Sequence, residues 1–244
     1  MDRIRQLGER KYPIQEHWLA ECYRTMLVIS ERLGKETAES VAYQEKYERL
    51  KENINRFYWN EEKGAYIDSF SSGKNHVSRH ANIFAILFDI ADRGRKEQIA
   101  AKVLRNDEIP QITTSYFKFY EMDALCRMGC LEEVLTRIRE YWGGMLERGA
   151  VTFWEECDPA VLAEEQYDMY GDKFGKSLCH AWSASPIYLL ARYFVGLKIT
   201  DPLQEEYELH PHLEYFDSLD CTLPVGSRNI HMMWDGTKLT VEEL

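Results

Sequence analysis

The sequence predicts a mainly α-helical fold built from helical hairpins, followed by a short β segment at the C-terminus. Three observations lead to this prediction. Apolar residues recur at three- and four-residue spacing through the first two-thirds of the 244 residues. The segments between these stretches alternate between tight turns and long loops, as in a series of antiparallel helices. After Thr200-Asp201-Pro202 the pattern becomes typical of strands.

The expected helices follow from the spacing of their apolar residues. The first has an apolar face of mostly four-residue spacing that starts at Ile14, and Gly34 ends it. The second alternates four- and three-residue steps from Tyr43 to Phe57, which form one apolar stripe. Gly196 suits the end of the last helix. The other expected helices span residues 78–92, 95–105, 114–128, 131–142 and 185–195.

The connections between the helices are of two kinds. Short turns are expected at Gly94 and Gly129, whereas the loops at 58–77, 106–113 and 143–184 are long and rich in aromatic and polar residues. In a ring of hairpins the tight turns lie on one face and the long loops on the other. We therefore expect functional residues on the face that carries the long loops.

The change of pattern near Pro202 suggests a domain boundary. Residues 1–202 are expected to form the helical-hairpin portion, and residues 203–244 the start of a β-sandwich-like module. Segments 205–213 and 228–242 resemble strands, and Asp235-Gly236 is a strong signal for a two-residue hairpin turn. About forty residues are too few for a complete sandwich. The C-terminal module is therefore expected to be truncated or to pack against the helices.

Composition excludes several classes of partner. With 30 basic and 41 acidic residues the net charge is −11, and no Lys/Arg-dense patch with interleaved aromatic residues occurs, so nucleic acid is not an expected partner. No apolar run of about 18 residues would span a membrane, and the first residues lack the apolar core of a secretory signal. The six cysteines are scattered, which suggests reduced thiols in a cytoplasmic protein. Neither a metal nor a cofactor is expected, because no zinc pair or phosphate-binding loop is present.

The segment from Trp142 to Pro159 is the most informative for function. Two glycines should let the chain turn sharply, and the stretch that follows ends in Trp154, Glu155, Glu156 and Asp158. An indole ring can cover the apolar face of a pyranose, and carboxylates accept hydrogen bonds from its hydroxyl groups. A carboxylate in such a cleft can also activate water. A solvated acidic cluster beside a core tryptophan is the alternative interpretation.

Three further helix starts carry polar and aromatic residues. His180 and Trp182 precede the last helix, Arg79 and His80 open the helix expected at 78–92, and Tyr116 opens the one expected at 114–128. Each signal alone is weak, and His180 could simply hold its own loop in place. Their coincidence at the starts of several helices indicates that the long loops share one cleft.

Four stretches together resemble one family. They are Gly149-Ala-Val-Thr-Phe-Trp-Glu155-Glu, Gly175-Lys-Ser-Leu-Cys-His180-Ala-Trp, Ser115-Tyr-Phe-Lys-Phe-Tyr-Glu-Met-Asp-Ala-Leu and Tyr193-Phe-Val-Gly-Leu-Lys. They resemble the six-hairpin domain of the α-L-rhamnosidases, from about residue 12 to the end of the chain. The Gly-Ala-x-Thr-x-Trp-Glu run is the most specific part of the resemblance.

The resemblance implies a partial (α/α) six-hairpin toroid and the inverting hydrolysis of terminal α-L-rhamnosides. It implies that Glu155 is the general base, and that the strands after residue 203 open the β-sandwich that follows the toroid. A rhamnoside is then the expected substrate. The candidate substrate-binding residues are Trp154, His180, Trp182, Tyr116, Arg79 and His80.

The general acid that inversion requires is missing from the pattern. Inverting enzymes need a second carboxyl group about 6.5–9.5 Å from the base. In the family this acid lies in an Asp-Glu-Arg segment followed by Gly-Trp and Gly-Asp, and the chain has no such segment. Glu121, Glu156 and Asp158 are conceivable substitutes, but none is favoured.

The expected number of helices also falls short. Six hairpins need about twelve helices, whereas roughly seven are expected in this sequence. The chain is therefore expected to be a fragment of a longer enzyme or one member of a split gene. Its partner would be the missing N-terminal part of the same enzyme or a second copy of the chain.

Three alternatives remain open at this point. The chain could belong to another toroid glycosidase, such as an unsaturated-uronyl hydrolase. It could be a sugar-binding remnant without catalysis, which would share the aromatic cleft but lack the acid. It could also be a helical interaction scaffold, which predicts that Glu155, His180 and Trp182 lie far apart.

Overall fold

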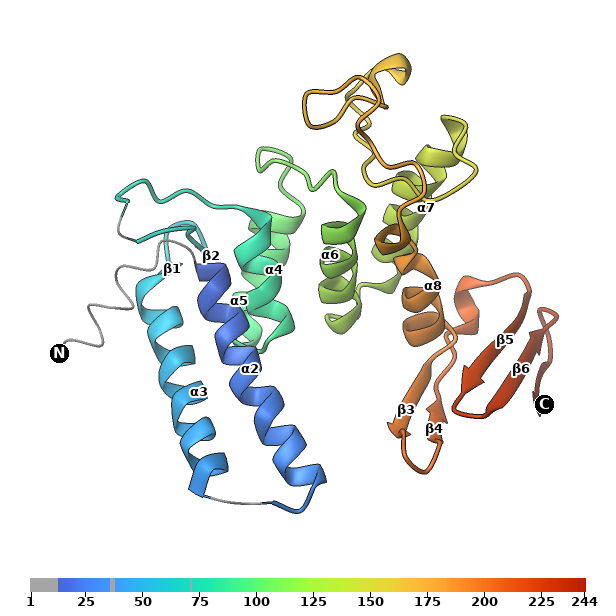
Figure 1. Ribbon diagram of the computed structural model, residues 1–244, viewed down its shortest axis with the longest axis horizontal. Coiled ribbons are helices and arrows are strands. Elements are labelled where there is room, and N and C mark those ends of the chain that lie inside the picture. Colours follow the sequence, from blue (N-terminus) through green and yellow to red (C-terminus); the bar gives the residue numbers. More distant parts are fainter. Residues whose placement is uncertain (1–12, 36–37, 71) are drawn as a thin grey trace. The chain divides into compact units, whose positions relative to one another are not determined.

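The computed structural model describes residues 13–35, 38–70 and 72–244, and the chain divides into two compact units, Met1–Ile112 and Thr113–Leu244 (Figure 1). Seven α-helices and seven short strands occur in the described part of the chain. The helices lie where the apolar spacing predicts them, and the paired strands are concentrated near the C-terminus. The mainly α fold with a short C-terminal β segment is thus confirmed.

The first unit is built from two long helices and a helical layer packed on them. Its elements are α2 (Pro13–Arg32), α3 (Ala38–Phe57), α4 (Arg79–Leu87), α5 (Arg93–Ile99), the π-helical stretch η1 (Ala100–Leu104) and the short strands β1 (Trp59–Asn60) and β2 (Ala65–Tyr66). Ile83, Phe84 and Ile86 of α4 are buried in its core. The side chain of Asn82 accepts a hydrogen bond from the Tyr66 amide (2.8 Å) and donates to the Tyr66 carbonyl (3.0 Å), which fixes the β1–β2 hairpin on α4.

The helices of the second unit are α6 (Ser115–Arg127), α7 (Leu131–Glu147) and α8 (Ser185–Leu189), which continues as the π-helical stretch η4 (Leu190–Phe194). Along α7 the buried residues recur at three- and four-residue steps, as expected for a helix with one face in the core. The sharp turn expected at Gly143-Gly144 is wrong, since both glycines lie inside α7. The helix continues because Trp142 and Met145 are buried on either side of them, which offsets the roughly 1 kcal/mol that each glycine costs.

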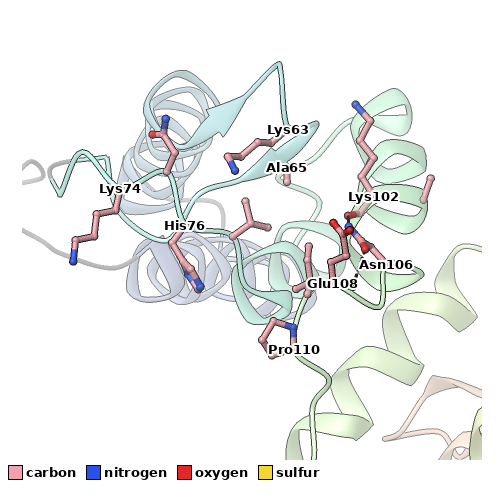
Figure 2. A pocket seen from close by; sticks show the side chains of 12 residues that line it. Lys63, Ala65, Lys74, His76, Lys102, Asn106, Glu108 and Pro110 are labelled. Atoms are coloured by element: carbon pink, nitrogen blue, oxygen red, sulfur yellow. Dashed lines mark hydrogen bonds between the residues drawn. The ribbon is translucent and has the colours of Figure 1, made fainter.

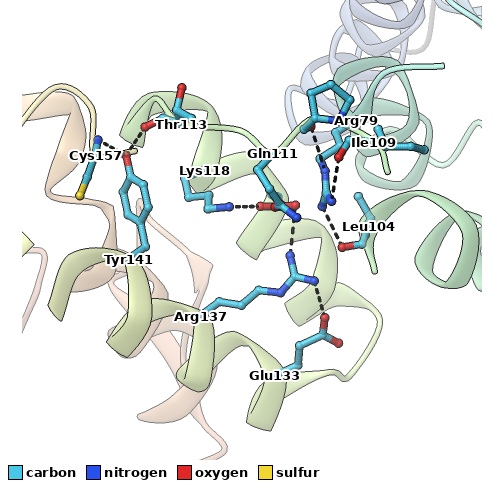
Figure 3. A network of polar contacts seen from close by, with 12 residues as sticks. Arg79, Leu104, Ile109, Gln111, Thr113, Lys118, Glu133, Arg137, Tyr141 and Cys157 are labelled. Carbon is cyan, nitrogen blue, oxygen red and sulfur yellow. Dashed lines mark hydrogen bonds and ion pairs between the residues drawn. The ribbon is translucent and has the colours of Figure 1, made fainter. Parts of the chain in front are cut away.

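A buried ionic network fastens α6 to α7. Glu121 is fully buried, and its carboxylate lies 2.9 Å from the Lys118 ammonium and 3.1 Å from the Arg137 guanidinium. Arg137 also pairs with Glu133 at 2.7 Å (Figure 3). Since α6 begins beside the segment that carries Glu155, this network helps to fix one wall of the candidate site.

The C-terminal strands form two small antiparallel sheets. The strands β3 (Leu197–Asp201) and β4 (Glu206–Leu209) form one sheet, and β5 (Leu219–Val225), β6 (Arg228–Trp234) and β7 (Leu239–Glu243) form the other. The expected hairpin turn at Asp235-Gly236 is confirmed, because Trp234 pairs with Leu239 across it. Apolar side chains from both sheets share one core around Val195, Val225, Ile230 and Met232.

The start of the β segment differs from the expectation. β3 begins at Leu197 and pairs with β4 across Pro202, so the expected boundary at 202/203 lies inside a hairpin. The division into residues 1–202 and 203–244 stays a prediction. Gly196 joins η4 to β3 with a positive φ of 77°, and a Cβ there would lie 2.0 Å from the His210 carbonyl oxygen. Only glycine fits this position without displacing the neighbouring strand.

Candidate active site

The backbone of Glu155 is fixed on one side by the start of α6. Its carbonyl accepts hydrogen bonds from the Ser115 amide (3.1 Å) and from the fully buried Ser115 hydroxyl (2.9 Å). Two residues further on, the Cys157 amide donates to the Thr113 carbonyl (3.2 Å). The Tyr141 hydroxyl donates to the same carbonyl (2.6 Å) and accepts from Cys157 (3.3 Å) (Figure 3). The segment therefore has little freedom to move relative to α6 and α7.

The loop before α8 fixes the other side of the same segment. The Glu155 amide donates to the Ser177 carbonyl (2.9 Å), and the His180 amide donates to the Phe153 carbonyl (2.8 Å). These contacts bring His180 into the neighbourhood of Glu155. Two segments that lie far from Glu155 in the sequence, the start of α6 and the loop before α8, thus contact the Glu155 segment.

The carboxylate of Glu155 is half-buried, and both of its oxygens accept hydrogen bonds. The Tyr170 hydroxyl donates to Oε1 (2.7 Å) and the Ser177 amide donates to Oε2 (3.2 Å). The Tyr170 hydrogen bond is the main reason that the pKa of Glu155 is lowered, and the Ser177 amide and the charges of His180 and Lys176 act in the same direction. Partial desolvation opposes them. The group is therefore ionised at neutral pH, which a general base requires.

Three rings form an exposed cluster in the same unit. The Trp182 side chain is 67% exposed, and its ring centroid lies 4.9 Å from that of Tyr116 and 5.8 Å from that of His180. The His180 ring meets the indole edge-on, whereas the Tyr116 ring is tilted against it. An exposed indole beside a phenol and an imidazole offers an apolar face and polar donors, which is the combination that sugars need.

Trp154 has a different environment. Its side chain is only 3% exposed, and its ring packs edge-on against Tyr167 at 5.8 Å. The buried indole therefore packs in the core and supports the segment that carries Glu155. The expected contact between Trp154 and the sugar does not fit this burial, because the core covers the faces of the ring.

Arg79 and His80 belong to the first unit. Arg79 is 1% exposed, and its guanidinium donates to the carbonyl of Leu104 at the end of η1 (2.8 Å). It also donates to three carbonyls of the loop that follows, those of Asn106 (3.0 Å), Pro110 (3.2 Å) and Ile109 (3.4 Å). Figure 3 shows the Arg79 side chain beside Leu104 and Ile109. Its donors are used to hold a loop, which does not fit the expected contact with a sugar. His80 is half-buried on α4.

The carboxylates considered as substitute acids all hold local structure. Glu121 is enclosed by its two cations. Glu156 accepts a hydrogen bond from the Thr113 hydroxyl, and Asp158 accepts one from the Ala160 amide (2.9 Å). Each of the three carboxylates is thus engaged in a contact within its own part of the second unit.

Tyr170 is a residue of the candidate site that the sequence alone does not predict. Its φ of 56° is positive, a conformation that non-glycine residues adopt rarely. Reciprocal hydrogen bonds between Met169 and Asp172 (3.0 and 2.9 Å) hold the turn in which it lies. The only sequence signal was the Tyr170-Gly171 step inside a loop rich in polar residues. Such outliers cluster at functional sites, because surrounding structure must stabilise them.

Comparison with known families identifies the chain. The family described as the bacterial alpha-L-rhamnosidase 6 hairpin glycosidase domain matches residues 5–194. The chain belongs to this family. Membership of the rhamnosidase six-hairpin family agrees with the helical hairpins described above and makes the chain part of a glycoside hydrolase fold. A comparison with curated protein sequences finds no match.

Two solved structures are similar to this rhamnosidase-family chain. The GH78 family rhamnosidase of Bacillus sp. GL1 is 24% identical with a TM-score of 0.82, over 95% of this chain and 25% of its own. A rhamnosidase from Klebsiella oxytoca with rhamnose bound is 26% identical with a TM-score of 0.61, over 74% of this chain and 34% of its own. The chain thus spans between a quarter and about a third of the length of these proteins.

Within residues 13–35, 38–70 and 72–244, no group of three or more histidine, cysteine or acidic side chains is arranged to hold a metal ion. In the same part of the chain, no helix combines the length and the hydropathy needed to cross a bilayer. The six cysteines are free thiols.

Proposed function

We propose that Glu155 is the general base of an inverting α-L-rhamnosidase and that this chain supplies the base side of its active site. The observation that carries the proposal is the convergence of an ionised, hydrogen-bonded carboxylate with His180 and the exposed ring of Trp182 in one unit. Glu155 takes a proton from a water molecule, whose oxygen attacks the anomeric carbon as the glycosidic bond breaks. A second carboxyl group gives its proton to the departing oxygen.

Each expected binding residue has a role in this proposal. Trp182 and Tyr116 offer their rings to the apolar face of the rhamnose, and His180 donates to a hydroxyl group. Trp154 acts indirectly, by supporting the Glu155 segment from the core. Arg79 stabilises the loop after η1, and His80 remains a candidate substrate contact in the first unit.

The proposal includes a partner. The side chains considered as acids are engaged in local structure, so we expect the general acid on a segment beyond these 244 residues. That segment would come from the N-terminal part of the same enzyme, since the Bacillus structure is about four times as long as the matched region. Self-association of the chain is the second possibility. A rhamnoside substrate and a cytoplasmic location belong to the same proposal.

The decisive experiment compares two glutamine variants in the longer enzyme. Glu155→Gln should lower the rate of aryl α-L-rhamnoside hydrolysis by about 10²- to 10⁴-fold, because general base catalysis is lost. Glu147→Gln makes the same change at an exposed position on α7 and should keep the rate unchanged. Full hydrolysis by Glu155→Gln would contradict the assignment of the base.

A sugar-binding remnant without catalysis is the second candidate. It is favoured by the engagement of Glu121, Glu156 and Asp158 in local contacts. It predicts that rhamnose quenches or enhances tryptophan fluorescence of the chain, that Glu155→Gln leaves this affinity unchanged, and that the longer enzyme shows no turnover.

The two remaining alternatives make different predictions. An unsaturated-uronyl hydrolase would ignore rhamnosides in the same assay and cleave unsaturated uronides instead. A helical scaffold requires that Glu155, His180 and Trp182 lie apart. The His180 ring lies 5.8 Å from that of Trp182, and the His180 amide donates to the carbonyl of Phe153, two residues before Glu155. The geometry therefore favours the sugar-based functions.

A further inference from the structure

The first unit contains a pocket of about 840 Å³ that the rhamnosidase proposal does not use (Figure 2). One wall is formed by the β1–β2 turn and the loop that leads to α4, and the other by η1 and the loop after it. The charged residues that line it are Lys63, Lys74, His76, Lys102 and Glu108. Positive groups therefore outnumber negative ones here, although the whole chain carries a net charge of −11.

The first wall is braced by Asp68. Its carboxylate accepts hydrogen bonds from the His76 ring (2.5 Å) and from the Ser78 hydroxyl (2.7 Å). The Asp68 amide also donates to the His76 carbonyl (2.8 Å). The loop that carries Lys74 and His76 is therefore tied at its base, which gives the pocket a defined edge.

The second wall is braced by Arg79 and Asn106. The buried Arg79 donates hydrogen bonds to the last carbonyl of η1 and to three carbonyls of the loop after it. The Asn106 side chain accepts from the Glu108 amide (2.9 Å) and donates to the Lys102 carbonyl (3.2 Å) (Figure 2). A buried arginine and an asparagine bridge thus hold the wall that carries Lys102 and Glu108.

Gly64 positions one of the cations. It has a positive φ of 58°, and a Cβ at this residue would lie 2.8 Å from Cδ and 2.9 Å from Nζ of Lys102. Because Gly64 has no side chain, the Lys102 side chain can lie across the β1–β2 turn. Lys102 and Lys63, the residue before Gly64, both line the pocket.

The lysines of the pocket have no counter-ion among residues 13–35, 38–70 and 72–244. In the part of the chain that the structure describes, no ion pair or hydrogen bond engages the ammonium groups of Lys63, Lys74 or Lys102. Cations that share a rim repel one another, and an anion bound between them would remove that repulsion. The charge of the pocket therefore favours binding of a negatively charged ligand.

The size and lining of the pocket indicate the kind of anion. Its volume lies in the range of about 300–1,000 Å³ that accommodates drug-sized ligands, far more than a single inorganic anion requires. Asn75 and Asn106 supply amide groups, and Val77, Ile109 and Pro110 supply apolar surface. Amides for hydroxyl groups, apolar surface for ring faces and lysines for carboxylates together match an acidic sugar.

We propose that this pocket binds a carboxylate-bearing oligosaccharide, recognised by Lys63 and Lys102 through its carboxylates. All residues of the pocket belong to the first unit, and none of them is part of the proposed Glu155 machinery. Binding here therefore does not depend on hydrolysis, and it survives if the rhamnosidase proposal fails.

Calorimetric titration of the chain at low salt tests the proposal, with trigalacturonate as the acidic probe and maltotriose as the neutral one. Trigalacturonate should bind and maltotriose should not. Lys63→Gln combined with Lys102→Gln should weaken trigalacturonate binding by about tenfold or more, because charge-assisted contacts are lost. Lys35→Gln removes a charge at an exposed position after α2 and should leave binding unchanged.

Three results would overturn the proposal. They are no binding of trigalacturonate, equal weakening by the Lys35 variant, and equally tight binding of inorganic sulfate, which would make the pocket a site for small anions only. Circular dichroism of the double variant serves as the folding control. Both lysines are exposed, and neither forms an ion pair within the part of the chain that the structure describes, so we expect a native spectrum. Glu155→Gln should leave trigalacturonate binding intact, which separates this test from that of the hydrolase.

Discussion

Replacing Glu121 by glutamine is expected to destabilise the second unit by about 3 kcal/mol, because removal of one partner of a buried ion pair leaves uncompensated charge. Glu121 is fully buried between the Lys118 ammonium at 2.9 Å and the Arg137 guanidinium at 3.1 Å. A glutamine oxygen could still accept from one cation, but its amide group would then face the other.

The expected loss of stability depends on the contacts that Lys118 and Arg137 retain in the variant. Breaking a buried pair costs about 3–5 kcal/mol. The lower end applies here because Arg137 retains Glu133 at 2.7 Å and because the Lys118 and Arg137 side chains are slightly exposed. For a chain of this length, a loss of about 3 kcal/mol lowers Tm by roughly 6–12 °C.

Urea and thermal denaturation followed by tryptophan fluorescence would measure this loss. Glu140→Gln, at an exposed position on α7, is the matched control and should change stability by less than about 0.5 kcal/mol. The double variant Lys118→Met with Glu121→Leu removes both charges and should recover most of the lost stability. The stabilising role of the buried ionic network is refuted if Glu121→Gln has the same free energy of unfolding as the control, or if the double variant is as unstable as Glu121→Gln.

Three further variants test other parts of the structure. Gly196→Ala should lose at least about 2 kcal/mol in urea denaturation, because its backbone is left-handed and a Cβ would collide with the His210 carbonyl; unchanged stability would contradict the close approach. Tyr170→Phe should raise the pKa of Glu155, because it removes the main hydrogen bond to the ionised carboxylate. In a ¹³C NMR titration the carboxylate should then take up its proton at a higher pH, and an unchanged titration would exclude that contact. Arg79→Met should cost about 3 kcal/mol or more and speed amide exchange in the loop after η1, because buried carbonyls lose their donor; wild-type exchange there would refute the fastening role.

The helices could be predicted from the sequence because local spacing determines them. The buried face of α7 is visible as three- and four-residue steps from Leu131 onward. Its end could not be predicted, because burial of Met145 carries the helix beyond two glycines that locally favour a turn. The expected helix at 78–92 likewise stops at Leu87, where Asp89 adopts a positive φ of 54°.

The candidate site was predictable in part. Helix starts that carry polar and aromatic residues lead to the expectation that His180 and Trp182 lie together, and their rings are 5.8 Å apart. The burial of Trp154 and of Arg79 was not, because burial depends on packing between segments that lie far apart in the sequence. The same holds for Tyr170, whose hydroxyl reaches Glu155 only through the turn that the folded loop imposes.

A crystal structure of the chain soaked with L-rhamnose would show where the sugar binds relative to Glu155 and Trp182. We expect the sugar ring to lie against the indole of Trp182, with its anomeric carbon on the side of the Glu155 carboxylate and room for one water molecule between them. A rhamnose bound away from Trp182 and His180, or a Glu155 carboxylate turned away from the sugar, would contradict it.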